Sequence, residues 1–137
     1  MSAISLRQLL SAACIFSLGA ASGVTAQLYS DSRERVEQHR ADLSGAEHME
    51  VIVSTAEYQP GDTVARHFHH GLEAAYIVQG ATVEAPGKGT MTLTTGQSLL
   101  NLRDVRHAGF VVSGDTALKL FTVHIVDKDQ PLYDYAD

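Results

Sequence analysis

The stretch GDTVARHFHHGLEAAYIVQG, residues 61–80, combines three histidines with a glutamate. In an extended strand, residues i and i+2 point to the same face, so His67 and His69 can converge on one ion while His70 points away. Glu73 follows a glycine at which the chain can turn into a neighbouring strand, with the carboxylate at its start. Imidazole and carboxylate together suit a borderline divalent ion such as Fe, Mn, Ni, Cu or Zn. The pattern alone also fits a chance coincidence of exposed loop histidines.

The chain around this stretch has the pattern of one all-β domain. Short segments rich in Val, Ile, Thr, Leu and Tyr are bounded by glycine every 9 to 16 residues, which is typical of a sandwich or barrel. The 137 residues are 45% hydrophobic and 19% charged, which excludes a disordered or collagen-like chain. The expected strands are residues 49–58, 64–69, 74–79, 81–85, 90–93, 99–102, 107–112 and 117–126.

The net charge and the cysteine content exclude some classes of partner and of metal site. The net charge is -6 and no run of five basic residues occurs, so nucleic acid is not an expected partner. The sequence has one Cys, which excludes disulfide frameworks and thiolate metal cages. Any metal chemistry therefore depends on the seven histidines and on carboxylates.

The first 26 residues have the features of a secretory signal peptide. One positive charge precedes an apolar stretch from Leu9 to Val24, and small residues up to Ala26 form a cleavage site. The alternative is a membrane anchor, but the stretch is shorter than the roughly 20 residues that span a bilayer. Cleavage after Ala26 predicts a periplasmic or secreted protein with no membrane association. Residues 27–46, polar and charged, are expected to form an N-terminal arm or edge element outside the core.

Two motifs in this sequence resemble those of the cupin superfamily. Residues 61–80 match the first motif, G-x5-H-x-H-x3,4-E-x6-G, at every defined position. Gly96 begins a partial match to the second motif, in which His107 falls at the position of the histidine. Leu102, Asp104 and Val111 stand where that motif has Pro, Gly and Asn. The resemblance extends over residues 41–132, so we place a cupin domain at 47–132 and a C-terminal tail at 133–137.

The resemblance implies a double-stranded β-helix, the jelly-roll barrel of the cupins, with a metal ion inside it. Carried over by position, the metal ligands are His67, His69, Glu73 and His107. Four protein ligands leave an ion with open coordination positions, which is the mark of a catalytic rather than a structural site. One divalent transition metal is therefore the expected cofactor, and a small molecule is the expected partner.

Two further residues are candidates for a catalytic role. Asn101 could orient a ligand or a water near the metal, or it could be a polar residue of the barrel rim. His124 shares a strand face with Leu118, Leu120 and Thr122, and it could act as an acid or base if that face lines the barrel. The alternative is a histidine near a strand end whose nitrogens bond to backbone groups.

The sequence leaves two classes of function open. One is a metal-dependent enzyme of the oxidoreductase or dioxygenase, isomerase or lyase type that acts on a small organic molecule. The other is a non-catalytic protein that binds a metal or small ligand outside the cytoplasm. In both cases the apolar stripe Phe121, Val123 and Ile125 predicts a homodimer, because a strand left bare at a sheet edge invites aggregation.

Overall fold

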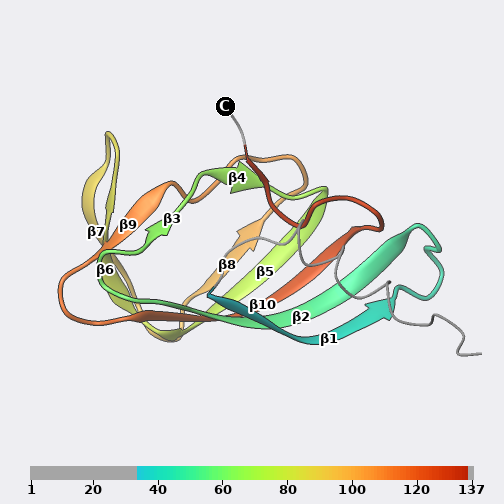
Figure 1. The fold of residues 1–137 in the computed structure, drawn as a ribbon, viewed down its shortest axis with the longest axis horizontal. Coiled ribbons are helices and arrows are strands. Elements are labelled where there is room, and N and C mark those ends of the chain that lie inside the picture. The colour runs from blue at the N-terminus through green and yellow to red at the C-terminus, as the bar shows by residue number, and fades with distance from the viewer. Residues whose placement is uncertain (1–33, 136–137) are drawn as a thin grey trace, which may run out of the picture.

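The structure, a computed structural model, describes residues 34–135, and all regular elements in this range are β-strands (Figure 1). The predicted signal peptide lies outside the described residues. No helix in the described range is long and apolar enough to cross a bilayer. The strands are β1 (Arg35–Asp42), β2 (Met49–Tyr58), β3 (Thr63–Val64), β4 (His67–Phe68), β5 (Gly71–Gln79), β6 (Ala81–Ala85), β7 (Gly89–Leu93), β8 (Ser98–Asn101), β9 (Phe110–Ser113), β10 (Leu118–Asp127) and β11 (Asp134–Tyr135).

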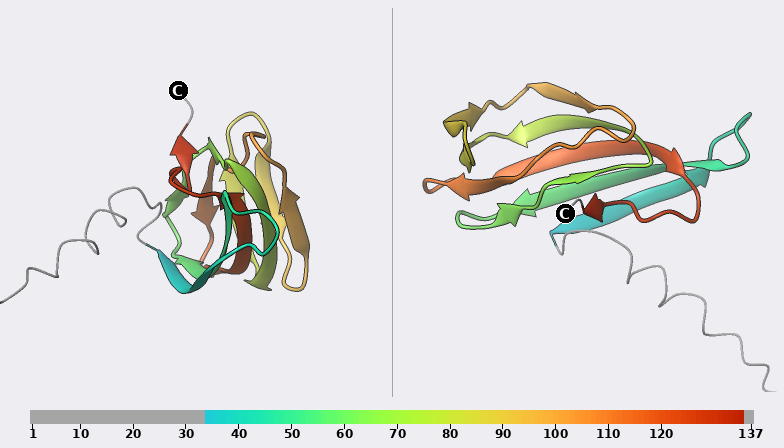
Figure 2. Two further views of the ribbon diagram at one scale, coloured as in Figure 1. Left: turned by 90° about the vertical axis from the view of Figure 1, so that its right-hand side faces the viewer. Right: turned by 90° about the horizontal axis from the view of Figure 1, so that it is seen from above.

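The strands form two main sheets that fold over one another as a jelly roll (Figures 1 and 2). The larger sheet has the order β1-β2-β10-β5-β8, and the smaller has the order β3-β9-β6-β7. A third, two-stranded ladder joins β11 to β4 above the larger sheet in Figure 1. All neighbouring strands are antiparallel. The predicted all-β, double-stranded β-helix fold is confirmed.

β10 lies at the centre of the larger sheet, between β2 and β5. It pairs with β2 over its full length, from Leu118 opposite Tyr58 to Asp127 opposite Met49. The expectation that this strand lies bare at a sheet edge is therefore wrong. The edges of the larger sheet are β1 and β8, and β1 contains part of the segment expected to be an N-terminal arm.

The barrel interior has an apolar cluster at each end. The larger cluster holds Ala56, Tyr58, Val64, Ile77, Ala81, Val83, Val112 and Leu118. The smaller holds Ile52, Val126, Leu132 and Tyr133. Buried polar side chains occupy the layer between them: Ser54, His67, His69, Glu73, Thr122 and His124. Burial of each large aliphatic side chain contributes roughly 1.5–3 kcal/mol to the stability of the fold. The two apolar clusters therefore stabilise the barrel on both sides of the polar layer.

Six of the eight expected strands have different bounds in the structure, and only 49–58 and 81–85 agree with it. The segment expected at 64–69 is divided into β3 and β4, because the chain leaves β9 after Val64 and pairs with β11 from His67. The strand expected from His107 begins at Phe110. Ala108 and Gly109 have φ angles of 57° and 80°, which are not extended conformations.

Candidate metal centre

His67 and His69 lie at the point where the chain passes from one sheet to the other. Both imidazoles are buried, with 3% and 0% of each residue exposed, and their ring centroids are 4.9 Å apart. His70 is on the other side of the chain, where its Nε2 is 3.1 Å from Oδ2 of Asp134. The HxH spacing therefore places two imidazoles inside the barrel and leaves the third at its surface.

Glu73 enters the same space from β5. Gly71, two residues earlier, packs so closely against β10 that a Cβ there would lie 2.1 Å from the carbonyl oxygen of Ile125. Only glycine permits this approach, which sets the start of β5 and hence the height of Glu73 in the barrel. Oε2 of Glu73 is 3.3 Å from Nε2 of His69 and 3.4 Å from Nε2 of His107.

His107 reaches the site although its motif is altered. Asp104, at the position of the motif glycine, takes the left-handed conformation with φ of 58°, which Asp tolerates better than most residues. Its amide donates to the carbonyl of His69 at 3.0 Å. The backbones of His107 and His67 then pair with each other, with N–O distances of 2.9 and 3.2 Å.

All three imidazoles are held in the same tautomer. Nδ1 of His67 donates to the carbonyl of Ala65, Nδ1 of His69 to Leu132 and Nδ1 of His107 to Val105. A carbonyl only accepts, so each Nδ1 carries the proton and each Nε2 presents a lone pair. Backbone carbonyls commonly fix metal-binding histidines in this way. Nε2 of His107 is buried without a hydrogen-bond partner in the described residues, which fits a metal ligand.

Asn101 lines the cavity and also contacts the carboxylate of Glu73. It lies on β8 directly opposite Glu73 in the register, and its Nδ2 donates to Oε2 of Glu73 at 2.6 Å. This bond orients the carboxylate toward the histidines. Asn101 is thus a positioning residue for Glu73 in this structure.

His124 faces Glu73 from the other side, on β10. Its Nε2 is 3.4 Å from Oε1 of Glu73, and the residue is completely buried. Within the described residues neither ring nitrogen has a hydrogen-bond partner. The alternative that backbone groups satisfy these nitrogens is therefore wrong.

Burial and the central carboxylate determine the charges of the cluster. Burial lowers the pKa of His67 to about 4 and that of His124 to about 3. Burial also opposes protonation of His107, but its contact with Glu73 and its bond to Val105 raise the pKa above its usual value. Burial alone would raise the pKa of Glu73, yet the surrounding histidines hold it well below its usual range, so the carboxylate is ionised.

A cavity of about 100 Å³ adjoins the histidines. His67, Glu73, Asn101 and His107 form its polar wall. The rest of its lining is mostly apolar: Ala56, Val64, Ala75, Leu93, Leu99, Ala108, Phe110, Leu118 and Leu120, together with Tyr58, Thr122 and Tyr133. A site of this size holds several waters or a small organic molecule.

Sequence reasoning missed the contribution of the segment before β11. Tyr133 is 7% exposed, with its ring centroid 4.4 Å from that of His67 and 5.0 Å from that of His69. The carbonyl of the preceding Leu132 orients His69. The only sequence signal is an apolar pair after Pro131, which is too weak to locate these contacts.

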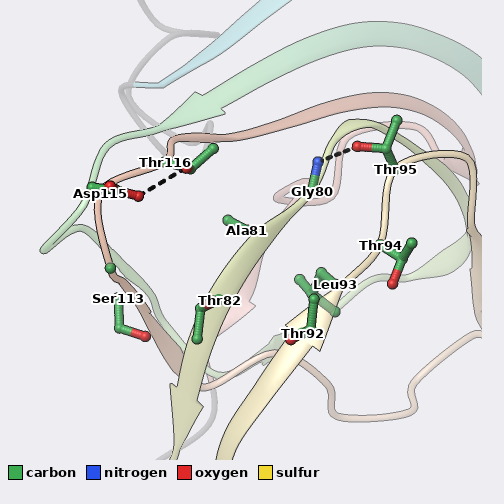
Figure 3. A pocket seen from close by; sticks show the side chains of 11 residues that line it. Gly80, Ala81, Thr82, Thr92, Leu93, Thr94, Thr95, Ser113, Asp115 and Thr116 are labelled. Carbon is green, nitrogen blue, oxygen red and sulfur yellow. Dashed lines mark hydrogen bonds between the residues drawn. The ribbon is translucent and has the colours of Figure 1, made fainter.

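A second hollow, of about 350 Å³, lies away from the histidines between the turns that follow β5, β7 and β9 (Figure 3). Its lining is rich in hydroxyl groups and includes Thr82, Thr92, Thr94, Thr95, Ser113 and Thr116. Asp115 is its one ionisable residue, and no histidine lines it. Of these two hollows, only the one in the barrel interior is lined by candidate metal ligands.

Comparison with known proteins identifies the class. The sequence family described as "Cupin domain" matches residues 54–124, more than half of the chain, so this protein belongs to the cupin family. Similar solved structures include the polyketide cyclase RemF from Streptomyces resistomycificus, with a TM-score of 0.53 and 19% identity over 77% of this chain and 72% of that chain. A double-stranded β-helix protein from Klebsiella pneumoniae has a TM-score of 0.52 and 14% identity over 85% of this chain and 98% of its own. No curated protein matches this sequence. At these identities the structural likeness shows the fold alone.

Proposed function

We propose that this cupin binds one divalent transition metal through His67, His69, Glu73 and His107, and a small organic molecule in the adjoining cavity. The observation that carries the proposal is the common arrangement of the three histidines: each has Nδ1 bonded to a backbone carbonyl, and their ligand nitrogens lie within 4.8 Å of one another. Three imidazole nitrogens and a carboxylate oxygen suit Fe, Mn, Ni, Cu or Zn, and availability decides among them.

The proposed activity is metal-dependent catalysis of the oxidoreductase or dioxygenase, isomerase or lyase type. A bound ion would supply Lewis-acid or redox chemistry at the polar wall of the cavity. Asn101 would hold the carboxylate of Glu73 in its ligating orientation, while the apolar lining excludes water from the substrate. Fold alone does not choose among these reactions.

A non-catalytic binding role is the second candidate, and the cavity lining favours it in one respect. Apart from Tyr58 and Tyr133, no titratable residue outside the four proposed ligands lines the cavity in the described part of the chain. A general base independent of the metal ligands is thus not evident. In this role the protein would capture a metal or small ligand outside the cytoplasm, after export directed by residues 1–26.

Metal analysis of protein isolated from its own compartment tests the proposal. We expect one ion per chain. We also expect some small organic molecules to raise the melting temperature of the metal-loaded protein but not that of the chelated protein. Incubation of each such molecule with loaded protein, followed by mass spectrometry, separates an enzyme from a binding protein, since only an enzyme yields product. Protein that stays metal-free after incubation with each of the five ions would overturn the metal assignment.

We also propose that the outer face of the larger sheet joins two copies of the chain. Val53, Val123, Ala74 and Leu100 form one continuous row across β2, β10, β5 and β8. Phe121 and Tyr76 stand side by side in the next row, 39% and 49% exposed. When one face of an antiparallel sheet is in water, the side chains on that face are usually polar. In these two rows the outward side chains are mostly apolar instead.

The size and charge of the face fit a second copy. Five strands about 4.8 Å apart and up to ten residues long cover on the order of 700 Å², close to the roughly 800 Å² per partner of a stable interface. The charged residues near its two ends are already paired, Lys119 with Glu57 and Arg103 with Asp127. A two-fold related copy therefore meets no unpaired charge from these residues.

A further inference from the structure

His124 has a position that the four-ligand arrangement does not use. Its imidazole is completely buried in the polar layer of the barrel, opposite Glu73. Neither of its nitrogens has a hydrogen-bond partner in the described residues, and Oγ1 of Thr122, on the same face of β10, is also without one. Buried polar atoms are nearly always paired, so the unpaired Nε2, which lies 3.4 Å from Oε1 of Glu73, points to a group that binds there.

The carboxylate of Glu73 connects His124 to the other histidines. Oε2 is 3.3 Å from Nε2 of His69, while Oε1 is 3.4 Å from Nε2 of His124. The ring centroids of His69 and His124 are 4.7 Å apart. One ligand atom each from His69, Glu73 and His124 lies within 4.8 Å of the others, as is also true of His67, His69 and His107.

His69 belongs to both of these three-residue groups. An ion bound to His69 would therefore have other imidazoles on two sides of it. His67 and His107 approach from the loop side, where the cavity lies, and His124 approaches from β10 on the sheet. Apart from the Glu73 carboxylate, 3.4 Å from Nε2, no polar group of the described residues pairs with the ring nitrogens of His124.

We propose that His124 is a fifth protein ligand, so that the centre holds its ion with four imidazoles and one carboxylate. The inference rests on the proposed metal-binding function and assigns His124 as a ligand instead of a proton-transfer residue. Five protein ligands would leave an ion that accepts six ligands with room for a single donor atom of a small molecule in the adjoining cavity. The nitrogen-rich set also favours Ni, Cu or Zn over Mn.

The test uses protein loaded with Zn²⁺ alone. X-ray absorption of the wild-type protein measures the number of imidazole ligands and needs no variant to fold. We expect four imidazoles in the wild type and three in His124→Phe, a substitution that keeps a ring of similar size in the barrel. Competition with a chelator should give a Kd for Zn²⁺ raised about 10- to 100-fold in His124→Phe. His70→Phe makes the same change at a histidine outside the barrel interior, and as the matched control it should keep the wild-type ligand count and Kd.

The outcomes separate this inference from the proposed function. Wild-type protein with three imidazoles and one carboxylate, together with an unchanged Kd in His124→Phe, would overturn the role of His124 and leave the four-ligand site intact. A wild-type protein that binds none of the five ions Fe, Mn, Ni, Cu and Zn would overturn both. If His124→Phe does not fold, the wild-type ligand count decides alone.

Discussion

His124 and Glu73 are direct cross-strand partners at the centre of the larger sheet, with Nε2 of one 3.4 Å from Oε1 of the other. Their separation is determined by the backbone pairing of β10 and β5 rather than by a flexible loop. A slip of that pairing by one residue would turn one of the two side chains out of the barrel. The position of the carboxylate is therefore as stable as the sheet itself.

Replacement of His69 should remove both metal and stability. His69→Ala deletes a central ligand, so we expect loss of stoichiometric metal and a melting temperature that falls toward that of the chelated wild type. Binding to the folded state alone contributes about 4 kcal/mol at a thousandfold excess over Kd. His70→Ala is the control, because its partly exposed side chain pairs with surface aspartates and should affect neither quantity. Full metal content in His69→Ala, or metal loss in His70→Ala, would refute the ligand assignment.

The metal-free protein should lose stability as the pH falls from 6.5 toward 4. The folded pKa values of His67 and His124, about 4 and about 3, lie below the value near 6.5 of an unfolded histidine. The unfolded chain therefore binds more protons in this window, and each residue lowers the free energy of unfolding by about 1.4 kcal/mol per pH unit. The pKa of His107 is raised in the folded protein, so the stability that its protonation contributes is fully present below pH 6.5. His107 therefore does not change the slope of the free energy of unfolding against pH in this window.

Urea denaturation in the presence of a chelator at pH 7, 6 and 5 measures this dependence. His124→Phe removes one of the two groups, so it should reduce the slope by about half. A free energy of unfolding that stays constant between pH 6.5 and 5 would contradict the assignment of neutral, buried histidines.

Loss of the Asn101 side chain should weaken metal binding without unfolding the protein. Asn101→Leu removes the hydrogen bond to Glu73 but keeps a side chain of similar size, and supporting contacts of this kind are worth about 10- to 100-fold in metal affinity. Isothermal titration with Zn²⁺ measures the change. Ser98→Ala, on the outer face of the same strand, should titrate like the wild type, and an equal affinity in Asn101→Leu would exclude the positioning role.

The outer face of the larger sheet should hold two copies together. Light scattering of the mature protein should give twice the chain mass, and Val123→Glu, which buries a charge in the centre of the face, should give the single mass. Lys119→Gln, at the end of the face, should remain dimeric. A soluble wild-type monomer at high concentration would show that no second copy covers this face.

Export should leave a mature chain that begins at Gln27. Amino-terminal sequencing of protein from the growth medium and the periplasm checks this, because cleavage after Ala26 removes the apolar stretch. Protein that remains with the cells and retains Met1 would contradict the prediction.

The sequence predicted the parts of the site that depend on local spacing. The bounds of β2 and β6 agree with the expected segments 49–58 and 81–85, because both alternate buried and exposed residues between clear turns. The motif residues His67, His69, Glu73 and His107 come together in the structure. Contacts that depend on distant pairing were not predictable. The central place of β10 and the docking of Tyr133 on His67 arise from partners remote in the sequence.

The carbonyl of Leu132, which orients His69 from 63 positions further along the chain, also dictates the order in which the centre can be assembled. During synthesis the two-histidine motif emerges long before this carbonyl exists. His69 can be held in its ligating orientation only after residues 132–135 have been made and have paired with β4. Capture of the proposed ion in the final geometry would therefore be a late event in the biogenesis of this protein, and a bound ion would report that the C-terminal segment has docked.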